Sequence, residues 1–223
     1  MKIHATVSIY NDHVFLSAML ESIKNVVDNI IIADGAYQLY YEHTRQYLPD
    51  IKPWSTDGSL EIIELFHDLP PTRIFKIPEG KPWLNQNVKR TALLEAVPLG
   101  DWFIIVDADQ MLKGEVKEGM QTIIDSGCIQ GRVPQYHAGL DQDRLHTFDH
   151  PRIFQKLEGM HYSGTHWQLR DKFGRIIEDS YPKKWTDQFY FVHLKAFKDY
   201  TKLFAHQSYM DVMSGQGWIE PSE

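Results

Sequence analysis

The sequence has a single cysteine, no apolar run long enough to cross a bilayer and no excess of positive charge. Cys128 has no partner for an intrachain disulfide, and the apolar run beside it favours a buried thiol over a nucleophile. No stretch approaches the roughly 20 apolar residues of a transmembrane helix, and the N-terminus lacks the apolar segment of a secretory signal. These absences predict a cytoplasmic protein without a membrane span.

The charge balance also excludes some partners. The formal net charge of −7 gives no overall attraction toward nucleic acid or an anionic lipid surface. With 223 residues, 43% of them hydrophobic, the chain is long enough to bury a core of its own. We expect one globular domain over residues 1–223.

Strand-like and helix-like segments alternate in the first half of the chain. The strand-like segments are 3–9, 29–34, 72–78 and 102–109, and the helix-like segments are 13–27, 55–66 and 84–97. Such alternation predicts an α/β protein whose mostly parallel sheet is flanked by helices. Residues 36–54 are rich in tyrosine and contain two prolines, so they are predicted as an ordered loop over the rim of the sheet.

The second half has a different pattern. A helix over 114–126 and a strand over 128–136 are followed by short segments with turn residues between them. The C-terminal part ends with a predicted strand over 188–194 and a predicted helix over 198–213. We therefore expect antiparallel strands beside the parallel sheet.

The most informative segment is GDWFIIVDADQ, from Gly100 to Gln110. Its continuous apolar run is typical of a strand buried on both faces, and Asp107 and Asp109 follow at its carboxyl end. Ligands of open α/β sheets bind at that end of the strands. Because two adjacent carboxylates repel each other, a divalent cation would suit them, although an Asp-rich turn is the alternative.

Other polar side chains are predicted at the same edge. Asp12 follows the first strand, Asp34 follows the second, and the helix over 84–97 carries Lys89 and Arg90. Acids at several strand ends that face a basic pair would suit a nucleoside diphosphate held through its metal ion.

The order of these motifs resembles family 2 glycosyltransferases of the GT-A fold. The segments that carry the resemblance lie between residues 3 and 195: Asp34-Gly35, STDGSLEII, PW, KR, GDWFIIVDAD, PRIF and YSGTH. The resemblance implies a GT-A fold and metal-dependent, inverting transfer of a sugar from a nucleoside diphosphate sugar, with a UDP-sugar favoured. It also implies a nucleotide-sugar-binding half over 1–112 and an acceptor-binding half over 113–223. A polysaccharide, a lipid carrier, a protein side chain and a modified nucleic-acid base all stay open as acceptors.

The resemblance also assigns roles to single residues. It implies that Asp34 contacts the nucleobase and that Asp12 lies near the nucleoside. Asp107 would contact the ribose or the donor sugar. Asp107 and Asp109 together would form the DxD pair at the metal, with Asp109 coordinating the ion that bridges the diphosphate.

Basic residues and histidines complete the implied site. Arg90 matches the family's phosphate-binding arginine, with Lys89 as the alternative partner. His193 and His166 are the candidates for a further metal ligand. His193 is preferred because it ends an apolar strand, where an imidazole without a partner would be costly. A mixed oxygen and imidazole set points toward Mn²⁺ or Mg²⁺.

Three positions depart from the family pattern: Gln110 replaces an acid, Thr91 an asparagine, and Trp167 a glutamate. The last change leaves the catalytic base open. Asp149 is preferred because it lies just before PRIF, and the other candidates are Asp141, Asp143, Glu178 and Asp187. Tyr162, Trp167 and Trp185 are candidates for stacking on the acceptor or for packing at a sheet edge.

Two other functions compete with transfer. A nucleotidyltransferase would share the α/β fold and the acidic site, but SIYNDHVF lacks the Gly-rich basic loop expected after the first strand. A degenerate module that binds a nucleotide sugar without catalysis is favoured by the departures at Gln110, Thr91 and Trp167.

Overall fold

The computed structural model describes residues 1–66, 72–75, 80–138, 151–164 and 168–194. Its elements in chain order are β1 (Ile3–Ile9), α1 (His13–Ile23), β2 (Asn29–Asp34), α2 (Gln38–Thr44), α3 (Ser59–Leu65), β3 (Thr72–Phe75), α4 (Gln86–Glu95), β4 (Trp102–Asp107), β5 (Gln110–Gly114), α5 (Val116–Asp125), β6 (Gln130–Arg132), β7 (Gln135–His137), β8 (Ile153–Gln155), β9 (His161–Ser163), β10 (Gln168–Arg170), α6 (Ile177–Ser180), β11 (Lys183–Trp185) and β12 (Phe189–His193).

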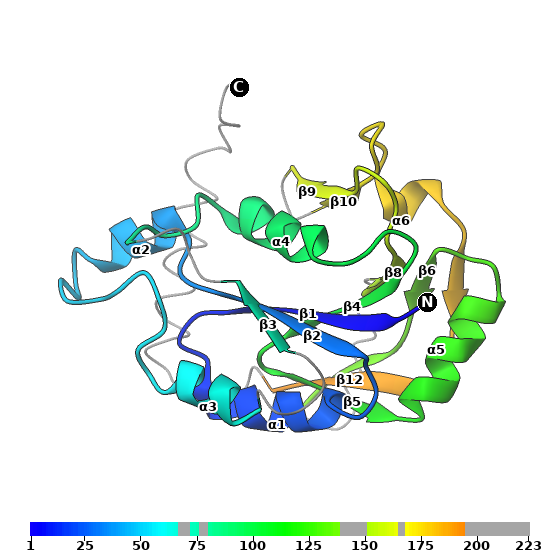
Figure 1. Ribbon diagram of the computed structural model, residues 1–223, viewed down its shortest axis with the longest axis horizontal. Coiled ribbons are helices and arrows are strands. Elements are labelled where there is room, and N and C mark those ends of the chain that lie inside the picture. Colours follow the sequence, from blue (N-terminus) through cyan, green and yellow to red (C-terminus); the bar gives the residue numbers. More distant parts are fainter. Residues whose placement is uncertain (67–71, 76–79, 139–150, 165–167, 195–223) are drawn as a thin grey trace.

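A seven-stranded sheet with the order β11-β6-β8-β4-β1-β2-β3 forms the centre of the molecule. Strands β4, β1, β2 and β3 are parallel, and β8 runs antiparallel to both β4 and β6. In Figure 1, α4 covers one face of this sheet, and α1 and α3 cover the other. The prediction of a mostly parallel sheet flanked by helices, with antiparallel strands added from the C-terminal half, is confirmed.

Two hydrophobic clusters hold the helices on the sheet. Along β4, Trp102, Ile104 and Val106 belong to the cluster under α1 and α5, whereas Phe103 and Ile105 belong to the cluster under α4. Alternate side chains point to opposite faces of a strand, so a continuous apolar run is buried on both sides. This explains why the segment that ends in Asp107 forms a central strand.

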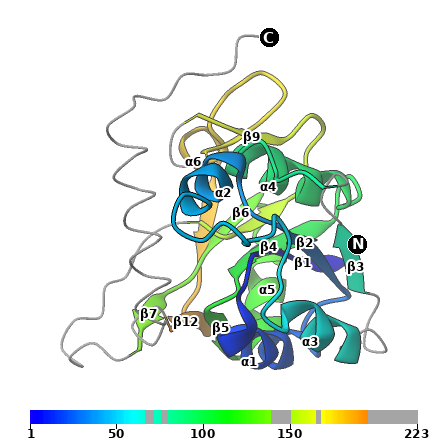
Figure 2. The same ribbon diagram turned by 90° about the vertical axis from the view of Figure 1, so that its left-hand side faces the viewer.

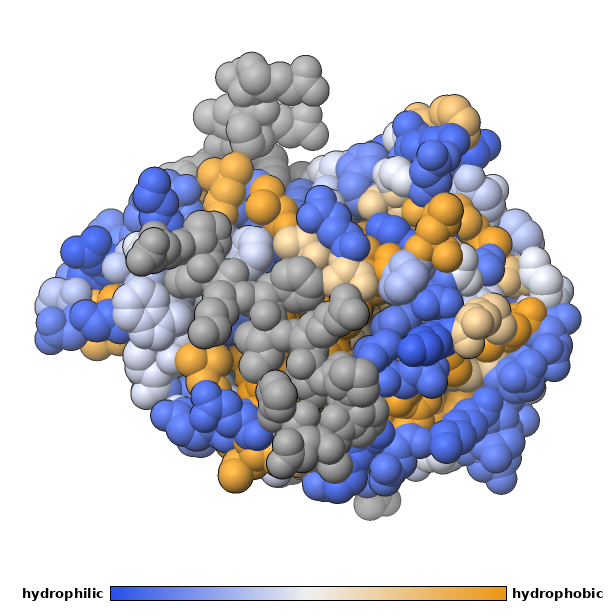
Figure 3. Space-filling model, viewed as in Figure 1, coloured by the Kyte–Doolittle hydropathy of each residue, from blue (hydrophilic) through white to orange (hydrophobic). Residues whose placement is uncertain are grey.

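The surface over α5 follows the helical period. Figure 3 shows hydrophilic residues along the lower right margin of the molecule, where Figure 1 places α5. On the inner side of the helix, Val116, Gly119, Met120 and Ile123 are buried. Apolar residues spaced three and four apart face the sheet, as expected for an amphipathic helix.

Strands β5, β12 and β7 form a second, three-stranded sheet. Strand β12 pairs antiparallel with β5 and parallel with β7. The predicted strand over 128–136 is therefore wrong as a single element, since β6 and β7 belong to different sheets. Pro134 lies between them; it has no N–H, and its carbonyl accepts a hydrogen bond from Phe191 of β12.

Three other segments refine the predictions. The predicted loop 36–54 contains the helix α2, and β5 follows β4 at once where no strand was predicted. The strand-like segment FGRIIE leads instead into the short helix α6. The helix predicted over 198–213 lies outside the described residues.

No helix in the described part of the chain has both the length and the apolar character needed to cross a membrane.

Candidate functional site

The carboxyl ends of β1, β2 and β4 lie side by side. Ile9 of β1 is paired with Asp34 of β2, and Ser8 of β1 is paired with Asp107 of β4. Figure 2 views the molecule from the side at which these strands end. The structure therefore brings Asp34 and Asp107 to one edge, separated by β1.

Asp34 is buried and held by one residue of a neighbouring loop. Ser55 donates its backbone N–H to Oδ2 at 3.1 Å and its hydroxyl to Oδ1 at 2.6 Å. The backbone carbonyl of Asp34 accepts the indole N–H of Trp83 at 2.6 Å. These bonds fix the carboxylate, and Ser55 is a site residue that the sequence prediction did not include.

Asp12 lies where two loops are joined by hydrogen bonds. Its Oδ2 accepts the backbone N–H of Tyr10 at 2.9 Å, and its own N–H donates to the hydroxyl of Ser59 at 3.0 Å. Asn11 next to it has a φ of 52°. This left-handed conformation is unfavourable for a residue that has a side chain. The bond from Thr56 N–H to Asn11 Oδ1, 2.9 Å, holds it there.

Lys89 is predicted to bind the donor, and the structure places its amine inside the protein. The residue is 1% exposed, and Nζ donates to the carbonyls of Ile9 and Gly35, both at 2.6 Å. Burial lowers the pKa of Lys89 to about 7, against the opposing effect of the Asp34 and Asp12 charges. Its donor-binding role stays a prediction.

Asp107 accepts hydrogen bonds from two arginines. Arg90 of α4 donates to Oδ1 at 3.2 Å, and Arg152, just before β8, donates to Oδ2 at 2.9 Å. Burial acts to raise the pKa of Asp107, but the charges of Arg152 and then Arg90 outweigh it and hold this pKa well below its usual range. The Asp107 side chain is 32% exposed, so this charged group borders the open edge of the sheet.

Arg152 is the main site residue that the sequence prediction missed. It belongs to the PRIF motif, where an arginine carries charge into an otherwise apolar segment. That motif supported the resemblance without giving this residue a role. Its contact with Asp107 spans 45 positions in sequence, which no local pattern reveals.

Tyr162 is buried and Tyr37 is half-buried, and the charge of Arg90 acts on both. The Arg90 guanidinium lies 6.0 Å from the ring centre of Tyr162. Burial raises the pKa of both tyrosines, and the positive charge of Arg90 opposes this rise. The stacking of Tyr162 on an acceptor stays a prediction, since the structure shows it packed beside Arg90.

Asp109, which is buried, and His193, which is partly buried, form a pair next to this group. Strand β12 places His193 opposite Gln110 of β5, and His193 Nε2 lies 3.0 Å from Asp109 Oδ2. The other ring nitrogen, Nδ1, lies 3.5 Å from the side-chain amide of Gln135. Two predicted metal ligands, 84 positions apart in sequence, are thus brought into contact.

Gln110, which replaces an acid of the family pattern, is fully buried. Its side-chain oxygen accepts the backbone N–H of Asp107 at 3.2 Å. The residue therefore closes the turn between β4 and β5, which places Asp107 and Asp109 relative to each other.

The Asp109–His193 pair fits part of a divalent metal site. Their 3.0 Å contact is a hydrogen bond in this structure, and its two atoms, a carboxylate oxygen and an imidazole nitrogen, are of the types that bind Mn²⁺ or Mg²⁺. Within the described ranges, no group of three or more His, Cys, Asp or Glu side chains could hold a metal. Magnesium commonly binds one or two carboxylates and takes its other ligands from substrate phosphates and water. The pair therefore suits a metal that arrives with a nucleotide.

Several predicted residues stand apart from this group or cannot be placed. The predicted base Asp149, the alternatives Asp141 and Asp143, and His166 and Trp167 lie outside the described residues. Of the other candidate bases, Glu178 pairs with Arg132 at 2.7 Å, and Asp187 is exposed. Trp185 is 48% exposed on β11, a strand at the edge of the sheet.

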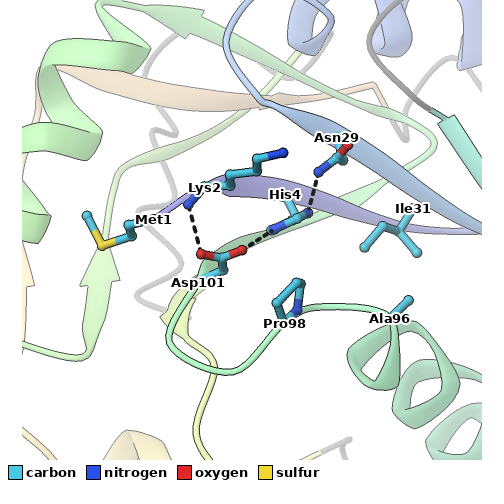
Figure 4. A pocket seen from close by; sticks show the side chains of 8 residues that line it. All are labelled: Met1, Lys2, His4, Asn29, Ile31, Ala96, Pro98 and Asp101. Carbon is cyan, nitrogen blue, oxygen red and sulfur yellow. Dashed lines mark hydrogen bonds and ion pairs between the residues drawn. The ribbon is translucent and has the colours of Figure 1, made fainter.

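A cavity of about 390 Å³ lies at the opposite end of the sheet. Figure 4 shows its polar wall, where His4 contacts Asp101 at 3.0 Å and Asn29 at 3.1 Å. His4, Asn29 and Asp101 lie at the amino ends of β1, β2 and β4. No predicted site residue lines this cavity.

No family model matches the sequence, and no curated protein matches it. Among solved structures, TarS of S. aureus aligns with 99% of this chain at a TM-score of 0.61 and 12% identity. The chain spans 41% of that TarS chain. The structure of TarS 1–349 in complex with UDP-GlcNAc aligns at a TM-score of 0.60 and 12% identity, covering 99% of this chain and 68% of that one. The two proteins share a fold, and the predicted GT-A-like α/β fold class is confirmed.

Proposed function

We propose that this protein is a glycosyltransferase that takes its sugar from a nucleoside diphosphate sugar, with a UDP-sugar as donor. The observation that carries the proposal is the convergence of the Asp34–Ser55 pair, Asp107 with its two arginines, and the Asp109–His193 pair at one sheet edge. The fold shared with TarS, one structure of which is a complex with UDP-GlcNAc, supports the choice of donor.

The nucleoside is assigned to the loops that follow β1 and β2. Asp34 would accept a hydrogen bond from the nucleobase, and its two bonds from Ser55 keep the carboxylate in one orientation. Asp12, held by Tyr10 and Ser59, would lie beside it. A carboxylate fixed before the ligand arrives loses little conformational freedom on binding.

The diphosphate is assigned to the two arginines on Asp107. A guanidinium carries five N–H donors, so an arginine bonded to a carboxylate can also bind a phosphate oxygen. Asp107 holds Arg90 through one oxygen and Arg152 through the other, and the group keeps one net positive charge. That charge would stabilise the leaving nucleoside diphosphate as negative charge develops on it.

Asp109 and His193 are assigned to a divalent metal, Mn²⁺ or Mg²⁺. The metal would supply Lewis-acid neutralisation of the diphosphate. When Nε2 is a ligand, Nδ1 carries the proton, and the Gln135 amide would turn so that its oxygen accepts this proton and orients the ring. Because both oxygens of Asp107 are engaged by arginines, its predicted place among the metal ligands stays a prediction.

The chemistry is proposed to invert the anomeric centre. An acceptor hydroxyl would attack as the nucleoside diphosphate leaves, and a carboxylate would take the hydroxyl proton. Asp149 is the predicted base. The buried surroundings of Asp34 and Asp109 would limit the entry of water, which competes with the acceptor.

A thermal-shift panel tests the donor and the metal together. UDP-, GDP-, TDP- and CMP-sugars are compared with and without Mn²⁺ on the wild type, Asp109→Asn and Asp171→Asn. Asp171 is the matched control, because it is a buried aspartate in a separate network with Arg175 and Tyr181.

A rise in Tm with a UDP-sugar and Mn²⁺, kept in Asp171→Asn and lost in Asp109→Asn, is the expected result, since a ligand that binds the folded state raises Tm. No shift with any donor would refute the proposal. If Asp109→Asn retained the full rise in Tm, the assignment of Asp109 to a metal would be wrong.

A further inference from the structure

The Lys89 side chain connects the two loops to which the nucleoside is assigned. Its amine bonds the carbonyl of Ile9, the last residue of β1, and that of Gly35, the residue after β2. Asp34 precedes Gly35, and Asp12 lies three positions after Ile9. One buried side chain thus joins the points from which both loops leave the sheet.

This arrangement is energetically unusual for a lysine. A buried ammonium is costly unless it is paired or hydrogen-bonded, and no carboxylate contacts Nζ directly in the described structure. Two carbonyl bonds of 2.6 Å and the Tyr37 ring, with its centre 5.4 Å away, take the place of water. A methionine or leucine would fill the same space without this cost.

Arg90, which follows Lys89 in α4, contacts the end of β4. Arg90 bonds Asp107 at the end of β4, while Lys89 bonds the ends of β1 and β2. Two consecutive helical residues therefore tie the loops after β1 and β2 to the arginine–aspartate group.

We propose that Lys89 is a positioning residue of the donor site, which fixes the loops carrying Asp12 and Asp34 relative to Arg90 and Asp107. The proposal rests on the proposed function for what the loops bind. It differs from a direct phosphate contact, because the residue is 1% exposed and its amine is already bonded to two backbone carbonyls.

The first arm of the test needs no ligand. Lys89→Met keeps the length and apolar stem of the side chain and removes its donors. Hydrogen exchange followed by mass spectrometry is measured at the amides of Gly35, Ala36 and Ser55, which bond Ile9, Pro53 and Asp34. The expected result is exchange at least tenfold faster at these amides, with core amides of β4 unchanged. Unchanged exchange at the loops would overturn the proposal.

Lys156→Met is the matched control. Lys156 is also partly buried, with a pKa lowered by burial, but it follows β8 near the amino end of β4, where its N–H bonds the Asp101 carbonyl. Its removal should leave the three loop amides and ligand affinity unchanged. If Lys156→Met accelerated exchange at the three loop amides as much as Lys89→Met, loss of any partly buried lysine would explain the effect. That result would overturn the proposal.

The second arm measures UDP-GlcNAc affinity by calorimetry, well below the Tm of each variant. Lys89→Met should weaken binding at least tenfold, and Lys89→Arg should restore part of it. In a double-mutant cycle with Asp34→Asn, the two losses should be non-additive, because Lys89 acts through the loop that carries Asp34. Additive losses or unchanged affinity would overturn the positioning role. If the wild type binds no UDP-GlcNAc while Lys89→Met speeds exchange at the loop amides, UDP-GlcNAc is excluded as the donor and the role of Lys89 in fixing the loops stands.

Discussion

At the scale of single residues, Asp107 organises the site by holding two arginines from distant parts of the chain. Arg90 comes from α4 and Arg152 from the segment before β8, and their side chains are only 13% and 18% exposed. Removing one arginine would leave the carboxylate with a single partner and would return its pKa toward the usual range.

Arg152→Met is expected to weaken UDP binding about tenfold or more, since a hydrogen bond to a charged group contributes about 1.5–3 kcal/mol. Arg152→Lys should lose less affinity, because it keeps the charge but not the fork of donors. Calorimetry with UDP measures both. Arg175→Met is the control, as Arg175 also pairs with an aspartate, Asp171. Equal affinity in Arg152→Met and the wild type would exclude Arg152 from the donor site.

The pKa of Lys89 predicts how stability changes with pH. The folded pKa of about 7 lies below the ordinary value of 10.5, so between these values the unfolded chain binds one more proton. The free energy of unfolding of the wild type, relative to Lys89→Met, should therefore rise with pH by up to about 1.4 kcal/mol per unit from pH 7 to 10. Urea unfolding at pH 6, 7, 8 and 9 checks this. A difference that stays flat over this range would show that Lys89 keeps an ordinary pKa in the folded state, and a difference that falls would also contradict a lowered pKa.

At the scale of elements, α5 lies close enough to β12 that only a glycine fits between them. A Cβ on Gly119 would lie 2.3 Å from Cδ1 of Phe189, the first residue of β12. The same strand ends in His193, so the packing of α5 helps to place the Asp109–His193 pair.

Gly119→Ala should destabilise the fold by up to about 2 kcal/mol. Overpacking costs about 1–3 kcal/mol, and the gain of about 1 kcal/mol from replacing glycine within a helix offsets part of this cost. Thermal unfolding should show a Tm lower by about 2–4 °C per kcal/mol. Glu118→Ala on the exposed face is the control. A raised Tm in Gly119→Ala would show that Phe189 and β12 shift to accommodate the added methyl group without loss of stability.

The sequence predicts elements well where its pattern is strong. Strands β1 and β2 have the bounds that their apolar runs predict, and β4 ends at Asp107 within its predicted run. Strand β5 and the separation of β6 from β7 were not predicted, because both depend on pairing with β12 far along the chain. The candidate site follows the same rule: residues at strand ends were predicted, whereas Ser55 and Arg152 depend on tertiary contacts.

At the scale of the whole molecule, the fold concentrates charge at one edge of a chain whose net charge is negative. At the carboxyl ends of the parallel strands, Asp12 and Asp34 lie near Lys89, and Asp107 bonds Arg90 and Arg152. Asp109 follows Asp107 by two positions and contacts His193. The carboxyl ends of the strands are the position at which open α/β sheets bind ligands. The cavity at the amino ends contains none of these residues, so it lies apart from the candidate site.

The most direct test of the central claim is release of UDP from UDP-sugars in the presence of Mn²⁺, measured with a coupled assay. UDP-GlcNAc, UDP-glucose and UDP-galactose are compared, with water as the acceptor of a slow background reaction. Metal-stimulated release is expected with at least one of them, reduced at least about tenfold in Asp109→Asn, in line with the 10- to 100-fold effects of changes around metal ligands. Binding without release of UDP from any donor would contradict catalysis and leave a nucleotide-sugar-binding module.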